Sequence, residues 1–109
     1  MSKQTAKDDP IELDLPDGVA DARQAVEMLR AWIADGSMML SLNADAFGER
    51  VVDWGRILGE IGHHVARSAK LNGYMSEHEA LQAVRQGFDA AMQSAQPTTS
   101  GKVRGRVNH

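Results

Sequence analysis

The spacing of hydrophobic residues changes twice along the chain, and each change predicts a different element. Asp21, with Gln24 three positions later, has the spacing of a helix-capping pair, and helically spaced apolar residues follow it. This pattern predicts a short first helix that ends near Leu29. Between Leu29 and Leu42 the period becomes two, which is typical of β-strands.

The dipeptide Asp35-Gly36 lies at the centre of the alternating stretch. It favours a type I′ hairpin turn, because both central residues of that turn need a positive φ. A two-residue loop at this point pairs Leu29 with Leu42 at the far end of the hairpin. One face of the hairpin is then wholly apolar and consists of Leu29, Ala31, Ile33, Met38, Leu40 and Leu42. A slip of one residue would invert one strand, so the pattern predicts this register. The alternative is that the first helix continues to Ile33.

The second half of the chain has the pattern of two helices. From about Gly48 to Asn72, apolar residues recur at alternating steps of three and four, in a stripe of Val51, Trp54, Leu58, Ile61, Val65 and Ala69. Gly73 follows as the expected left-handed residue that ends this helix. Ser76 and Glu79 have the spacing of a capping box, which predicts that the last helix starts at Glu77. The short connection makes the two helices antiparallel. The last helix carries an apolar stripe of Leu81, Val84, Phe88, Ala91, Met92 and Ala95.

Three glycines, Gly55, Gly59 and Gly62, lie inside the long helix, and each costs about 1 kcal/mol relative to alanine. We expect close packing against the last helix to compensate for them, with Gly62 near Gly87 and Gly59 near Ala90. The alternative is a groove in which a ligand or partner touches bare backbone.

These elements predict an α+β fold: a short N-terminal helix, a β-hairpin, and an antiparallel two-helix hairpin packed on the sheet. The composition of the ends differs from that of the middle. We expect residues 1–10 to be disordered, residues 11–95 to form a single domain, and residues 96–109 to form a disordered basic tail.

Composition narrows the classes of function. A chain of 109 residues has room for one small domain, and the absence of cysteine excludes disulfides and thiolate chemistry. The formal net charge is -3, and it falls to -6 without the three basic residues of the tail, so nucleic acid is an unlikely partner. The sequence has neither a secretory signal nor a run of about 20 apolar residues, so we expect a cytoplasmic protein without a membrane partner.

The other face of the predicted hairpin places Trp32 opposite Met39, with Arg30 beside them. A two-stranded hairpin alone is marginal in water, and an exposed tryptophan and methionine are typical of interfaces. We therefore expect a homodimer, and a protein partner of unknown identity, to use the face formed by Arg30, Trp32 and Met39. The alternative is that the first helix covers Trp32 within the monomer.

Glu60, His64 and Ser68 are spaced four apart, in an order that resembles a catalytic triad. Helix-interior N–H groups are already bonded and cannot form an oxyanion hole, so no catalytic residue is assigned. Glu60 and His64, together with Arg85, are instead candidates for a small-molecule pocket between the hairpin and the long helix. His63 and His64 lie about 100° apart on a helix and cannot chelate one metal ion. The sequence indicates no metal site and no cofactor.

Several motifs resemble a family of short bacterial proteins known as domain of unknown function 5076. They are Leu29-Arg30-Ala31-Trp32-Ile33-Ala34-Asp35-Gly36, Leu40-Ser41-Leu42, Trp54-Gly55-x-x-Leu58, His64-Val65-Ala66 and Gly87-Phe88-Asp89. The resemblance covers about residues 20–95. Because these are mainly hairpin, core and helix-packing residues, it implies no activity, substrate or cofactor, and no functional residue.

The leading hypothesis is a non-enzymatic, self-associating protein-interaction module. A small-molecule-binding or enzymatic pocket at Glu60, His64 and Arg85 is the second hypothesis. The third is a regulator that contacts an anionic partner through the basic tail, residues 96–109.

Overall fold

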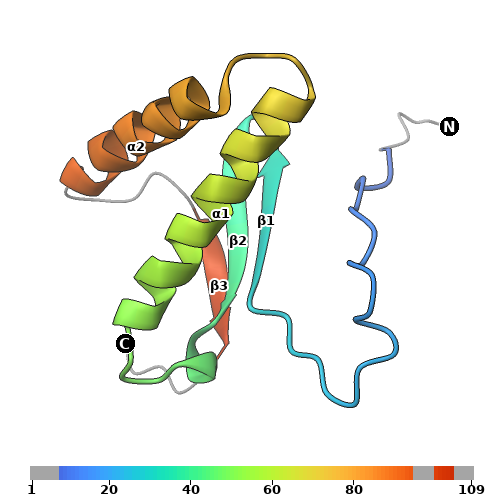
Figure 1. Cartoon of the computed structure of the whole chain (residues 1–109). Coiled ribbons are helices and arrows are strands. Elements are labelled where there is room, and N and C mark those ends of the chain that lie inside the picture. Colours follow the sequence, from blue (N-terminus) through green and yellow to red (C-terminus); the bar gives the residue numbers. More distant parts are fainter. Residues whose placement is uncertain (1–7, 95–99, 105–109) are drawn as a thin grey trace, which may run out of the picture.

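The structure is a computed structural model, and its described residues are 8–94 and 100–104. Figure 1 shows a three-stranded sheet beside two helices. The elements are, in chain order, β1 (Leu29–Ala34), β2 (Ser37–Asn43), the 3₁₀ turn η1 (Ala44–Ala46), α1 (Val52–Leu71), α2 (Glu77–Gln93) and β3 (Ser100–Arg104). The architecture is α+β, as the spacing of apolar residues predicts.

The β1–β2 hairpin has the predicted register. Leu29 pairs with Leu42 at one end, and Trp32 pairs with Met39 near the middle. The turn residues Asp35 and Gly36 have φ values of 50° and 81°, the left-handed conformation that a type I′ turn requires. The local turn chemistry therefore fixed which residue faces which across the hairpin.

The expected first helix is absent from the described residues. Residues 17–21 form a turn, and residues 25–28 have no regular structure. A helix of two turns is marginal without an apolar surface to pack against, and Val26 remains more than half exposed here. Leu29 is the first residue of β1, as the predicted hairpin register requires.

The sheet has a third strand that the composition of the tail did not reveal. Residues 96–109 were expected to be disordered, but Ser100–Arg104 forms β3, which pairs in parallel with β2. Parallel pairing joins residues about 60 positions apart, so no local pattern announces it. The last helix, α2, ends at Gln93, before the expected tail begins. The other residues of that tail, 96–99 and 105–109, lie outside the described residues.

Both predicted signals between the helices are confirmed. Gly73 has a φ of 76°, and the N–H of Tyr74 donates to the carbonyl of Ala69, as in a Schellman motif. Ser76 and Glu79 form the complete capping box: the backbone N–H of Glu79 donates to Ser76 Oγ, and that of Ser76 donates to the Glu79 carboxylate. Together these signals end α1, begin α2 and turn the chain back on itself.

The helices pack closely, but at different residues from those expected. A Cβ on Gly62 would lie 3.3 Å from Val84 Cγ1, and Ala66 and Ala80 are both buried nearby. A Cβ on Gly59 or Gly87 would meet no atom within 4 Å, so the expected contacts with Ala90 and Gly87 do not form. In Figure 1 the helices diverge away from their turn, which confines close packing to the turn-proximal end.

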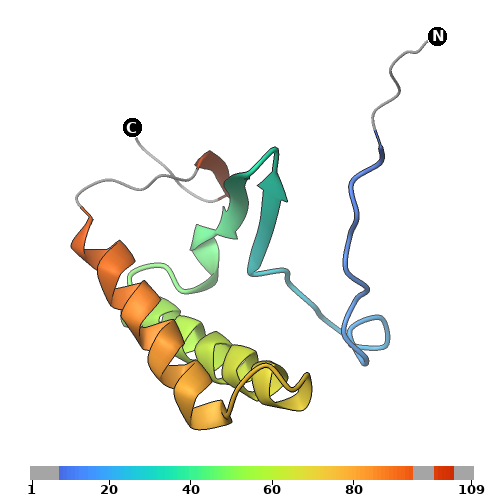
Figure 2. The ribbon, with the colours of Figure 1, turned by 90° about the horizontal axis from the view of Figure 1, so that it is seen from above.

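The helices and the sheet make few contacts with each other. Both helices lie on one side of the sheet (Figures 1 and 2), yet the extensive contacts run between β1 and β2, β2 and β3, and α1 and α2. Among the described residues, the only buried apolar side chains are those of Ala66 and Ala80. Within the described residues, the helical hairpin therefore lacks the expected packing on the sheet.

Gly62→Leu should destabilise the fold, because the added side chain would push α1 away from Val84. Overpacking of this kind costs about 1–3 kcal/mol, measurable by urea denaturation. The matched variant Gly59→Leu places the same side chain in open space and should lose much less. Equal losses would contradict the close contact at Gly62.

Glu79→Gln should weaken the fold at neutral pH but not in acid. Hydrogen bonds from Ser76, from its side chain first and then from its backbone, lower the pKa of Glu79. A lowered pKa stabilises the folded state above the ordinary glutamate pKa, and this contribution is lost as the pH falls through the lowered value. Urea midpoints at pH 7 and pH 3 would measure this. Glu77→Gln removes a carboxylate from the same turn without touching the box, so a similar pH dependence there would contradict the assignment.

Candidate functional site

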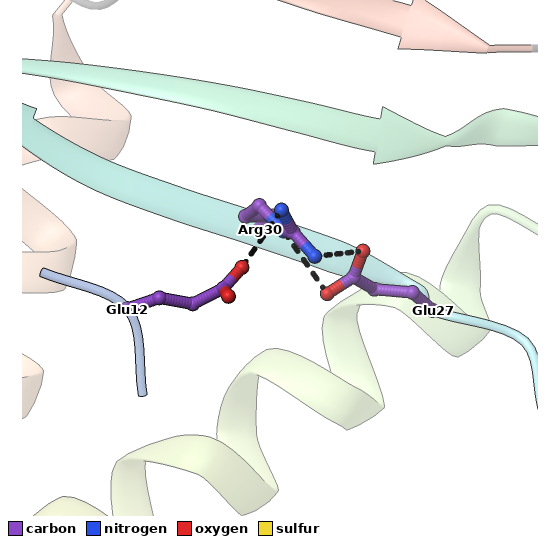
Figure 3. Close-up of polar contacts among 3 residues, drawn as sticks. All are labelled: Glu12, Glu27 and Arg30. Carbon is purple, nitrogen blue, oxygen red and sulfur yellow. Dashed lines mark hydrogen bonds and ion pairs between the residues drawn. The ribbon is translucent and has the colours of Figure 1, made fainter. Parts of the chain in front are cut away.

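Arg30 is the centre of a polar cluster at the outer strand of the sheet (Figure 3). Its guanidinium lies 3.2 Å from both oxygens of the Glu27 carboxylate, through Nε and Nη2. Its Nη1 lies 3.1 Å from Glu12 Oε2. All three side chains are exposed, so solvent screens these ion pairs and each adds little stability. The cluster positions the chain near Glu12 beside β1 without pairing the two backbones.

The structure brings the three residues of the expected interaction face together. Arg30 and Trp32 are two positions apart on β1, and Met39 is the cross-strand partner of Trp32, so all three share one face. Trp32 is half-buried, and Met39 is 43% exposed. The hairpin register was sufficient to predict this grouping.

An extended segment of residues 11–15, here called the N-terminal arm, was not recognised as an element from the sequence. It alternates apolar residues (Ile11, Leu13 and Leu15) with acidic ones (Glu12 and Asp14). Ile11 and Leu13 are each 92% exposed. A groove of about 580 Å³ lies between the arm and β1, lined by residues 11–16, 27 and 29–32. The alternation of apolar and acidic residues was the available signal for an extended segment. With only five residues and no turn next to them, the pattern did not indicate which strand the segment would lie beside.

The expected small-molecule site is assembled only in part. Glu60 and His64 lie one turn apart on α1 and line a surface depression of about 370 Å³, together with His63, Arg67 and Glu77. Arg85 is not among its lining residues, because α2 carries that side chain elsewhere. The depression lies between the two helices' surfaces rather than between the hairpin and α1.

Asp53 is nearly buried, although the helical pattern placed it on the exposed side of the long helix. It is 5% exposed, and its carboxylate lies 2.6 Å from the guanidinium of Arg50 and 3.6 Å from that of Arg56. It occupies the first turn of α1, where the helix dipole favours a negative charge. Close by in sequence, Phe47 and Trp54 make an edge-to-face contact with centroids 5.4 Å apart. These residues lie together at the start of α1, and the ion pairs with Arg50 and Arg56 compensate the charge of the buried carboxylate.

Within residues 8–94 and 100–104, no group of three or more acidic or histidine side chains is arranged to hold a metal ion. In the same part of the chain, no helix is long and apolar enough to cross a membrane. A further groove of about 590 Å³ is lined by residues 25–30, 41–43, 45 and 46, and both apolar and polar residues contribute to it.

This combination defines a small α+β protein with a hairpin-based sheet and an open helical hairpin. The model of the family described as domain of unknown function (DUF5076) matches residues 12–97, and the chain belongs to this family. The family match confirms the resemblance seen in the hairpin and helix motifs.

A solved structure is also similar to this chain. It is described as a candidate pyruvate dehydrogenase from the photosynthetic bacterium Rhodopseudomonas palustrus, and it is 32% identical with a TM-score of 0.59. The match covers 78% of this chain and 96% of that chain. No curated protein matches this chain.

Asp53→Asn should destabilise α1 while keeping the shape of the side chain. It removes the charge that two arginines and the helix dipole favour, which we expect to cost about 1 kcal/mol. Thermal or urea unfolding followed by circular dichroism would measure the loss. Glu60→Gln removes an exposed carboxylate from the middle of the same helix and should change stability far less; an equal effect would refute a special role for Asp53.

Proposed function

We propose that this protein is a self-associating interaction module whose working unit is a homodimer. The observation that carries the proposal is the lack of an apolar core: among the described residues, alanines are the only buried hydrophobic side chains. Domains of this size bury most of their apolar residues when they are stable alone. A second copy of the chain supplies the missing apolar surface and is always present at the same concentration as the first. Two-fold homodimers are the commonest oligomers of soluble proteins.

The uncovered apolar surface is concentrated on the helical hairpin. Five of the exposed large residues there belong to the two stripes that periodicity assigned to a core: Leu58, Ile61, Val65, Phe88 and Met92. Fully burying one such side chain contributes about 1.5–3 kcal/mol. The two helices diverge away from their turn (Figure 1), and the exposed residues of both stripes are available to a facing helix. Helices of the second copy fit this opening.

A protein partner would then meet the face formed by Arg30, Trp32 and Met39. Tryptophan, arginine and methionine are enriched in binding interfaces, and a half-buried tryptophan provides an anchor. The ion pairs of Arg30 are exposed and cheap to rearrange, so they do not oppose binding. The enzymatic name of the solved relative stays with that protein, because no arrangement of side chains described above favours that chemistry.

Phe88→Glu should convert the dimer to a monomer, because it places a charge in the apolar surface that the second copy covers. Analytical ultracentrifugation would show the molar mass of one chain instead of two. The control Gln82→Glu adds the same charge to the opposite side of α2 and should leave the dimer intact. A wild-type chain that stays monomeric at all concentrations would overturn the proposed function.

A further inference from the structure

The N-terminal arm and the outer edge of β1 face each other without pairing. In Figures 1 and 2 the arm runs beside β1, on the side away from β2. No backbone hydrogen bond joins the arm to β1 in the described residues; the ion pair of Glu12 with Arg30 connects them. The groove of about 580 Å³ separates them. The arm therefore lies apart from the outer edge of β1, although its alternating side-chain pattern suits pairing with that edge.

The hydrogen-bonding groups on that edge of β1 can be assigned. The N–H of Asn43 donates to the carbonyl of Met28, so residues 28 and 43 form a hydrogen-bonded pair. Such pairs alternate along an antiparallel ladder. The backbone groups of Leu29, Ala31 and Ile33 therefore point outward, toward the groove. This edge presents the unpaired backbone N–H and C=O groups of three alternate residues. Such an edge is a template for an added strand.

The side-chain pattern of the arm matches the two faces of the sheet. The ion pair of Glu12 with Arg30 places the acidic side of the arm on the Arg30 side of the sheet. Because side chains alternate, Ile11 and Leu13 then lie on the opposite side, with Leu29 and Ala31. A strand with the sequence of the arm would extend both the polar face and the apolar face of the sheet without interruption.

We propose that the arm of a second copy fills this groove, pairing with β1 on one side and with the resident arm on the other. The inference rests on the proposed self-association. A strand that lies between β1 and the arm pairs on both sides, so both of its edges must be free. Among the described segments, β1 and β3 each have one edge occupied and β2 has both, whereas the arm has both free. A strand from another copy's hairpin would therefore collide with the resident arm.

The exchange closes on itself, because a two-fold axis between the two arms places each arm in the other copy's groove. The continuous sheet then has the order β3, β2, β1, partner arm, arm, partner β1, partner β2 and partner β3. Both arms are acidic, and the guanidinium of Arg30 in each copy offsets the repulsion between them. The exposed Ile11 and Leu13 gain cover on the apolar face of the joint sheet.

Disulfide trapping tests the exchange, because the chain has no cysteine of its own. A tagged Leu13→Cys chain is refolded with an excess of untagged Ala31→Cys chain and oxidised mildly. Both positions are exposed and line the groove, so a partner arm that fills the groove beside β1 would bring these cysteines within bonding distance. We expect a covalent heterodimer, about tenfold more abundant than with Ser41→Cys, an exposed residue on β2 and one strand farther away.

Four outcomes separate the possibilities, with molar mass measured in parallel. A heterodimer of Leu13→Cys with Ala31→Cys supports the exchange. A third chain carries both Leu13→Cys and Ala31→Cys. If its disulfide closes only within single chains, the arm folds onto its own β1, which overturns the exchange. A covalent homodimer of Ala31→Cys, or a dimeric mass without any arm cross-link, also overturns the exchange but leaves self-association standing. A monomeric mass overturns both.

Discussion

The contact between α1 and α2 near their turn is the tightest packing in the described chain, and it determines which side chains of the two helices stay uncovered. Gly62 and Ala66 let Val84 and Ala80 approach, so the helical hairpin forms without large side chains between its helices. Because small residues make this contact, the larger apolar side chains need another surface to cover them. Leu58, Ile61, Val65, Phe88 and Met92 stay exposed outside this contact, and no other element of the described residues covers them.

The sheet shows the same incompleteness in backbone rather than in apolar surface. β2 is paired on both sides, by β1 through the hairpin and by β3 through a parallel ladder. β1 keeps a free outer edge, and an amphipathic extended segment lies across a groove from it. The proposed self-association would account for both the uncovered helical hairpin and the open sheet edge, since each lacks a surface that a second copy carries.

Much of the fold and part of the candidate site could be predicted because short-range signals specified them. Asp35-Gly36 set the hairpin register, which grouped Arg30, Trp32 and Met39 on one face. The spacing of Glu60 and His64 placed them on one helical strip, and they line one depression. Arg85 was assigned to that depression without a local signal. Its position depends on how α2 is rotated and tilted against α1, which spacing within one helix cannot specify.

The sequence by itself determined the turn at Asp35-Gly36, the end of α1 at Gly73 and the capping box that begins α2, because each depends on the conformational preferences of a few adjacent residues. Only the tertiary structure decided that residues 25–28 form no helix, that β3 joins β2, and that Asp53 is buried beside two arginines. It also decided that the periodic apolar stripes stay largely uncovered within one chain. Periodicity shows which side of an element avoids water, but the covering surface is set by long-range packing, which in a chain this small need not come from the same molecule.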